Sequence, residues 1–77
     1  MPYERNADLP DPVREALPEG ARTIYRKAFN GAWDQYADPG DRERGASREE
    51  TAHRVAWSAV KASYEKREGR WVRKTES

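Results

Sequence analysis

Apolar residues recur at helical spacing through the segment from Ala21 to Tyr36, and this pattern limits the folds open to the chain. They follow the i, i+3, i+4, i+7 series of an amphipathic helix. The series comprises Ala21, Ile24, Tyr25, Ala28, Phe29, Ala32, Trp33 and Tyr36. Gly31 interrupts it at a cost of about 1 kcal/mol relative to alanine, which predicts that another backbone approaches closely there. A helix with this stripe must bury it against a second element.

A second long helix is predicted from Ser47 to about Lys66, and it opens with a capping box. Ser47 can cap the first turn, and Glu50, three residues later, can reach back to the Ser47 N–H. The apolar face of this helix comprises Ala52, Val55, Ala56, Ala59, Val60 and Ser63, and is widened by His53, Trp57 and Tyr64. We expect the two apolar faces to pack together, with Phe29 and Trp33 at the centre of the core.

The remaining elements are short. Pro12 is a good first helical residue after an Asp11 cap, which predicts a short helix through Leu17. In the tail, Trp71 and Val72 form a β-prone run, and we expect it to pair with residues near Tyr3. The predicted fold class is mainly α: a compact small domain of one short and two long helices, with a small two-stranded sheet formed by the terminal segments.

Length and composition restrict the classes of protein. The 77 residues make one small domain, residues 1–77, with a charged mobile loop at 38–46 and a frayed end at 75–77. Cysteine is absent from the sequence, which excludes disulfides and thiolate metal sites. No apolar run approaches the ~20 residues that cross a bilayer, and the first residues lack the apolar core of a secretory signal. We expect a cytoplasmic protein without stable membrane insertion, and a monomer, because no apolar stripe is surplus.

Catalytic groups are scarce in the sequence. His53 is the single histidine, and its nearest acidic companion at helical spacing is Glu49. Without cysteine, arrangements of nucleophile and base are nearly unavailable. We expect His53 to pack at the edge of the core and bond a neighbouring element, and we predict that the protein is not an enzyme.

Acidic side chains around the predicted loop are the candidate metal ligands. Hard oxygen ligands suit Ca²⁺ or Mg²⁺, and the candidates are Asp38, Asp41, Glu43 and Glu49. Counting an EF-hand loop from Asp38 places Gly40 and Arg42 where oxygen ligands belong. The expected binding of divalent ions is therefore weak, and no other cofactor is predicted.

Basic residues form two candidate binding surfaces. One is the outer face of the first long helix, where Arg22, Arg26 and Lys27 can meet an acidic cytoplasmic loop or anionic lipid. The other is the tail, whose cations can neutralise phosphates and whose indole can stack on a base of a nucleic acid. Its residues are Lys66, Arg67, Arg70, Trp71, Arg73 and Lys74. The alternative for the tail is that Trp71 faces inward and the cations flank it. The net charge of the chain is only +1, which argues against a general nucleic-acid binder.

Several motifs together resemble the ChaB family of bacterial cation transport regulators. They are LP at Leu9, ALP at Leu17, IYRKAFNGAWDQYAD from Ile24 to Asp38, and ASREETAHRVAWSAVKASYEK from Ala46 to Lys66. The resemblance covers essentially the whole chain and implies helices with a small terminal sheet. It also implies a soluble accessory protein associated with a sodium or calcium/proton antiporter.

Three functions follow, in order of preference. The first is a non-enzymatic regulatory module that binds a protein partner, namely a cation antiporter. The second is a small DNA-associated protein that uses the basic tail, since looser relatives of the family resemble components of DNA-associated proteins. The third is a weak divalent-cation module that uses the charged loop.

Overall fold

The computed structural model describes residues 2–38, 40 and 44–74. Within them the chain forms one 3₁₀ turn, three α-helices and two β-strands. In order they are η1 (Asn6–Asp8), α1 (Asp11–Ala16), α2 (Glu19–Gln35), α3 (Arg48–Ser63), β1 (Tyr64–Arg67) and β2 (Arg70–Arg73). The predicted fold class is confirmed: the fold is mainly helical, with one short helix, two long helices and a two-stranded sheet. Of the predicted loop and frayed end, residues 39, 41–43 and 75–77 lie outside the described residues.

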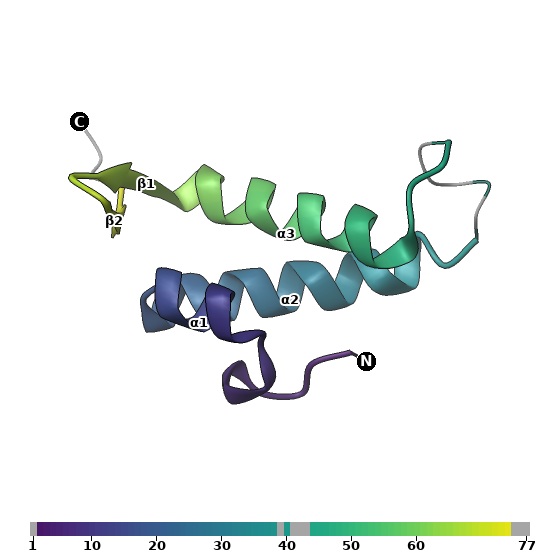
Figure 1. Cartoon of the computed structure of the whole chain (residues 1–77), viewed down its shortest axis with the longest axis horizontal. Helices are drawn as coiled ribbons and strands as arrows, with labels where there is room; N and C mark the ends of the chain where they lie inside the picture. Colours follow the sequence, from purple (N-terminus) through teal and green to yellow (C-terminus); the bar gives the residue numbers. More distant parts are fainter. Residues whose placement is uncertain (1, 39, 41–43, 75–77) are drawn as a thin grey trace.

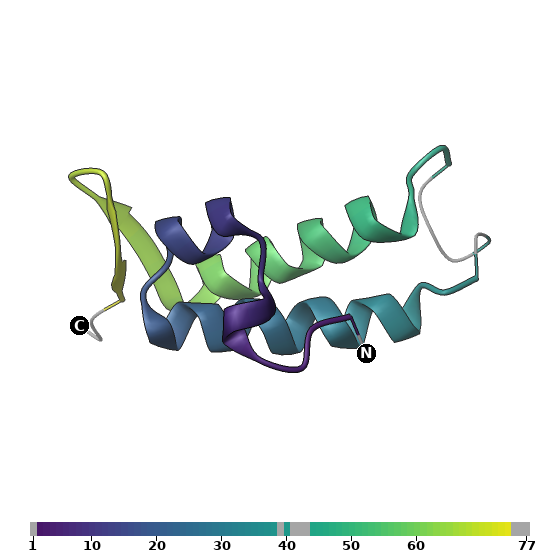
Figure 2. The same cartoon turned by 60° about the horizontal axis from the view of Figure 1, so that its bottom comes forward.

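The long helices α2 and α3 form the body of the molecule. They run antiparallel and lie side by side in both views (Figures 1 and 2). On α3 the face toward the core carries Ala52, Ala56 and Val60, each 0 % exposed, at spacings of four residues. On α2 the larger Tyr25 and Phe29 are buried in the same cluster. Small side chains on one helix thus leave room for aromatic rings on the other, as close packing of an interior requires.

The start of α3 is held by its cap and by the end of α2. The Glu50 N–H donates to Ser47 Oγ at 3.0 Å, so the predicted Ser47 cap is confirmed. The reciprocal half of the predicted capping box is wrong, because the Glu50 carboxylate pairs with Arg54 at 3.3 Å instead of reaching back to the Ser47 N–H. Arg48 Nε donates to the Trp33 carbonyl at 2.7 Å, and the guanidinium lies 4.2 Å from the Trp33 ring centroid. This arginine therefore satisfies a carbonyl at the C-terminus of α2 and adds a cation–π contact.

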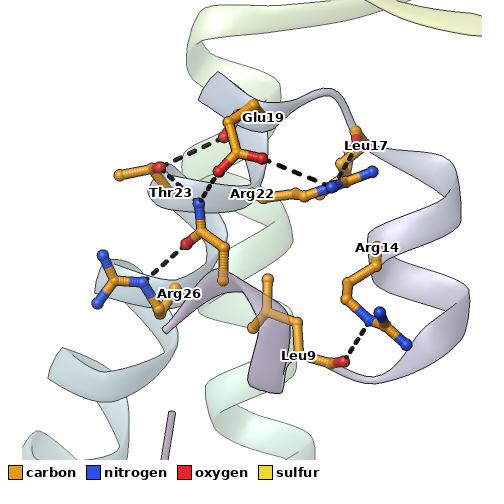
Figure 3. Close-up of polar contacts among 8 residues, drawn as sticks. Leu9, Arg14, Leu17, Glu19, Arg22, Thr23 and Arg26 are labelled. Atoms are coloured by element: carbon orange, nitrogen blue, oxygen red, sulfur yellow. Dashed lines mark hydrogen bonds and ion pairs between the residues drawn. The ribbon is translucent and has the colours of Figure 1, made fainter. Parts of the chain in front are cut away.

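Figure 3 shows how the N-terminal segment is fixed to α2. Three α2 side chains converge on one unlabelled amide in this view, and the hydrogen bonds identify it as that of Asn6. Asn6 Nδ2 donates to Glu19 Oε1 at 2.7 Å and to Thr23 Oγ1 at 2.9 Å, and Arg26 Nε donates to Asn6 Oδ1 at 2.8 Å. Nearby, Arg14 Nε donates to the carbonyl of buried Leu9 at 3.0 Å. These bonds hold the segment before α1 against α2 and α1.

The two-stranded sheet is a local hairpin, and the predicted pairing of the tail with residues near Tyr3 is wrong. β1 pairs antiparallel with β2, with Tyr64 opposite Arg73 and Lys66 opposite Trp71. Both residues of the connecting turn have positive φ, 50° at Glu68 and 81° at Gly69, as the favoured two-residue hairpin turn requires. Closing so short a loop costs little chain entropy, whereas joining the two ends of the chain costs more. The chain ends lie apart in both views (Figures 1 and 2).

The hairpin also shortens the second long helix relative to the prediction. α3 ends at Ser63, and Tyr64 takes an extended conformation (φ −128°, ψ 153°) as the first residue of β1. The predicted end at about Lys66 is therefore wrong. Tyr64 is 6 % exposed, so the strand begins with a residue that still belongs to the core.

Candidate functional site

A groove between the N-terminal part of the chain and the start of α3 is the candidate binding site. We call it the α1–α3 groove, and its volume is about 530 Å³. Its lining residues come from the N-terminal segment, α1, α2 and the first turns of α3. They are Tyr3, Pro10, Pro12, Val13, Tyr25, Phe29, Ser47, Glu49, Glu50 and His53.

One wall of the groove depends on how Tyr3 is held. The buried Asn30 side chain bonds to the backbone of Tyr3, accepting from its N–H at 3.2 Å and donating to its carbonyl at 2.7 Å. The Tyr3 ring then packs on Phe29 with the ring centroids 4.9 Å apart. A buried polar residue of α2, Asn30, therefore positions the Tyr3 ring as an aromatic wall of the groove by bonding to the Tyr3 backbone.

At the opposite side, α2 and α3 are linked by a hydrogen bond between side chains. Tyr25 Oη and His53 Nδ1 lie 2.6 Å apart. Tyr25 is 1 % exposed, and burial is the main cause that raises its pKa, with Tyr3 and Glu49 adding to the effect. The hydroxyl therefore stays protonated near neutral pH and can donate to a neutral imidazole. The prediction that His53 bonds a neighbouring helix is confirmed, although the residue as a whole is exposed.

The rim of the groove is acidic. Glu49 and Glu50 are exposed in the first turn of α3. The charge of Glu49 reaches the aromatic wall, because it adds to burial in raising the pKa of Tyr3. None of the described residues that line the groove is a lysine or arginine. The site therefore offers an apolar floor with carboxylates above it, and this arrangement suits the binding of another molecule.

The predicted metal ligands are only partly described. Asp41 and Glu43 lie outside the described residues. Asp38 is exposed, and its Oδ1 accepts from the Gly40 N–H at 2.9 Å, while Glu49 lies at the α1–α3 groove. Over residues 2–38, 40 and 44–74, no group of three or more histidines or acids is placed to hold a metal ion. The four-residue set therefore stays a prediction.

Two of the three basic residues predicted on α2 act within the fold. Arg22 Nε donates to the Leu17 carbonyl at 2.7 Å across the α1–α2 junction, and Arg26 donates to Asn6 (Figure 3). Lys27 is exposed. Lys27 is thus the most exposed of the three residues predicted to bind a partner.

The hairpin of β1 and β2 follows α3 (Figure 1) and carries five of the six predicted nucleic-acid residues, and the sixth, Lys74, directly follows β2. Trp71 is half-buried, and its ring lies 5.5 Å from that of Trp57. The inward orientation of Trp71, the alternative considered for the tail, is therefore confirmed. The five cations of the set are all exposed, namely Lys66, Arg67, Arg70, Arg73 and Lys74.

Most of the groove residues are not among the predicted site residues. The sequence predicts other roles for them: a strand near Tyr3, a helix start at Pro12, an apolar stripe with Tyr25 and Phe29, and a cap at Ser47. The residue that positions the wall is Asn30, which lies outside the apolar series beside Phe29, so the sequence pattern does not indicate that it is buried. Such a residue must find a hydrogen-bond partner when it is buried.

Comparisons with known proteins agree over nearly the whole chain. The ChaB family model matches residues 9–74. The chain is 54% identical over 76 residues to the "Putative cation transport regulator ChaB" of Escherichia coli (strain K12), and the match covers 97% of this chain and 100% of the relative. The protein of the same name from Shigella flexneri matches to the same extent.

A solved structure is also similar. It is the "NMR solution structure of the putative cation transport regulator ChaB", with a TM-score of 0.79 and 53% identity, covering 96% of this chain and 100% of that one. In the described part of the present chain, no helix combines the length and apolar character needed to cross a membrane.

Proposed function

Because this chain belongs to the ChaB family, we propose that it is a non-enzymatic regulatory module that acts in the cytoplasm by binding a sodium or calcium/proton antiporter. The observation that carries the proposal is the similarity, over 97% of the chain, to proteins named "Putative cation transport regulator ChaB". A chain of 77 residues with that role needs a surface for its target more than it needs a reaction centre.

The groove geometry supports a binding role. His53, the single histidine, is hydrogen-bonded to Tyr25. The raised pKa of Tyr25 keeps its hydroxyl protonated near neutral pH, so it does not supply a phenolate base. Buried apolar rings, including Phe29, form the floor of the α1–α3 groove. Apolar anchors inside a polar rim are the usual anatomy of a protein interface.

Affinity capture from membranes tests this function. The tagged chain, produced at native level, is recovered from membranes dissolved in a mild detergent, and its companions are quantified by mass spectrometry. We expect a cation antiporter to be enriched over a tag-only control. Recovery of the chain without any cation transporter, at a detergent concentration that preserves known membrane complexes, would contradict the proposal.

A DNA-associated role is the second candidate, and the exposed cations of the hairpin favour it. Five such residues on one small element can neutralise several phosphates. The inward-facing Trp71 leaves little indole for stacking on a base, so any binding would be electrostatic and weakened by salt. Fluorescence anisotropy with a labelled duplex at low salt tests it, with Arg70→Glu as the variant that should abolish binding. An unchanged anisotropy for the wild-type chain would remove this candidate.

A further inference from the structure

We infer that the α1–α3 groove binds an apolar segment that carries lysine or arginine, supplied by a cytoplasmic loop of the membrane partner. The inference rests on the proposed function for the source of the segment. The chemistry of the segment comes from the groove itself.

The floor and one wall of the groove are apolar and rigid. Val13 and Phe29 line the groove and are 5 % and 2 % exposed, and the Tyr3 ring packs on Phe29. Pro10 and Pro12 are exposed along the same wall. Each proline has a fixed φ and no N–H, so this wall offers little to a polar ligand and is already ordered before binding. It suits the aliphatic part of a side chain.

The charged side chains that line the groove determine which kind of segment it can bind. The chain has 15 lysines and arginines against 14 acids, yet the charged side chains that line the groove are both carboxylates. Glu50 is already paired with Arg54, so Glu49 is the main acceptor for an incoming cation. The N-terminus of α3 carries a partial positive charge of about half a unit, which the full negative charge of Glu49 outweighs. The local field therefore attracts a cation and repels an acidic segment.

Cytoplasmic loops of membrane proteins have the matching composition. Short loops on that side of the membrane carry an excess of lysine and arginine. Such loops also lie beside apolar residues at the membrane boundary, and the aliphatic stem of a lysine or arginine can cover apolar surface while its charge stays in water. A basic loop segment thus matches both the apolar floor and the acidic rim of the groove.

A pair of synthetic peptides tests this chemistry on the whole chain. The first alternates arginine with leucine, and the second replaces each arginine by glutamate. Amide chemical shifts are followed by ¹⁵N NMR during each titration. We expect the arginine peptide to shift the amides of Tyr3 and of residues 47–53, and the glutamate peptide to leave them unchanged. Equal shifts with both peptides, or shifts confined to the hairpin, would overturn the inference.

Charge reversal at the rim is the second arm. Glu49→Lys should weaken binding of the arginine peptide by at least about tenfold, because it places like charges opposite each other. Glu15→Lys is the matched control, since Glu15 is an exposed residue of α1 that does not line the groove. It should change the affinity by less than about twofold. Circular dichroism confirms that both variants remain folded, and the neutral Glu49→Gln repeats the test if Glu49→Lys does not fold.

The peptide titration and the capture from membranes test different claims, so either claim can be contradicted without the other. If wild-type protein captures an antiporter and Glu49→Lys captures it equally well, the groove inference is wrong and the proposed function stands. If no transporter is captured while the arginine peptide binds at the groove and Glu49→Lys abolishes that binding, the proposed function fails and the groove chemistry is supported.

Discussion

The side-chain amide of Asn30 bonds to both backbone polar groups of Tyr3. Its Oδ1 accepts from the Tyr3 N–H at 3.2 Å, and its Nδ2 donates to the Tyr3 carbonyl at 2.7 Å. This is the pairing that a neighbouring strand would provide, made here by one buried side chain that is 3 % exposed. The N-terminal segment therefore packs on α2 without joining a sheet. The Tyr3 ring forms one wall of the α1–α3 groove.

Removing that amide should destabilise the fold. Asn30→Ala leaves the Tyr3 N–H and carbonyl without their partner, and we expect the free energy of unfolding to fall by about 1–3 kcal/mol. Urea denaturation followed by tryptophan fluorescence measures the change. Gln35→Ala, an exposed amide in the same helix, is the control and should change stability by less than about 0.5 kcal/mol. Equal midpoints for the two variants would show that the Asn30 bonds contribute nothing.

Arg26 and Lys27 are adjacent in sequence but should differ in their effect on stability. Arg26 Nε donates to Asn6 at 2.8 Å, and its loss should cost about 1–2 kcal/mol because it also disturbs the bonds from Asn6 to Glu19 and Thr23. Lys27 is exposed, and Lys27→Ala should cost less than about 0.5 kcal/mol. Thermal unfolding of both alanine variants compares them. If they melt at the same temperature, the Asn6 cluster has no structural role.

Two glycines of α2 should respond in opposite ways to alanine. A Cβ at Gly31 would meet no atom within 4 Å, so Gly31→Ala should stabilise the helix by about 0.5–1 kcal/mol. A Cβ at Gly20 would overlap the Tyr64 hydroxyl, so Gly20→Ala should gain less or destabilise. The same substitution in a Tyr64→Phe background removes the obstructing oxygen and should recover the helix gain. Similar stabilisation by both single substitutions would contradict the close approach at Gly20.

Alkaline pH should destabilise the chain partly through Tyr25. Burial raises the pKa of Tyr25 above its ordinary value of 10.0 in the folded state. Above about pH 10 the unfolded tyrosine loses its proton while the folded one keeps it, so the free energy of unfolding falls as pH rises, by up to about 1.4 kcal/mol per pH unit. Urea unfolding from pH 8 to pH 11 should show a shallower fall for Tyr25→Phe than for the wild type. Identical slopes would contradict the assignment to Tyr25.

The helices were predictable from the sequence because their signals are local. The stripe from Ala21 to Tyr36 has one period throughout, and the cap at Ser47 needs only the next three residues. Periodicity alone does not identify which members of a stripe are deepest. The predicted central position of Trp33 is wrong, since Trp33 is half-buried, whereas Tyr25 is 1 % exposed and packs against the rings of Phe29 and Trp57.

The sheet partner and the groove depend on contacts between distant parts of the chain. The hairpin turn is Glu68–Gly69, which lacks the Asn-Gly or Asp-Gly signal of its turn type, so the helix was extended to about Lys66. The predicted close approach at Gly31 is wrong, and it occurs at Gly20, where Tyr64 returns from the end of α3. Glu49 was considered as a metal ligand, but its position at the groove follows from packing that brings Tyr3 to the start of α3.

Antiport in everted membrane vesicles tests the central claim, that the chain regulates a cation antiporter by binding it. Vesicles with a respiration-driven pH gradient are given Na⁺ or Ca²⁺, and the fluorescence of acridine orange reports proton efflux through the antiporter. Adding purified chain should change the initial rate or the apparent cation affinity, with saturation as the chain concentration rises, and heat-denatured chain should not. An initial rate and cation affinity unchanged at all chain concentrations, in vesicles whose antiporter is active, would contradict the proposed regulation.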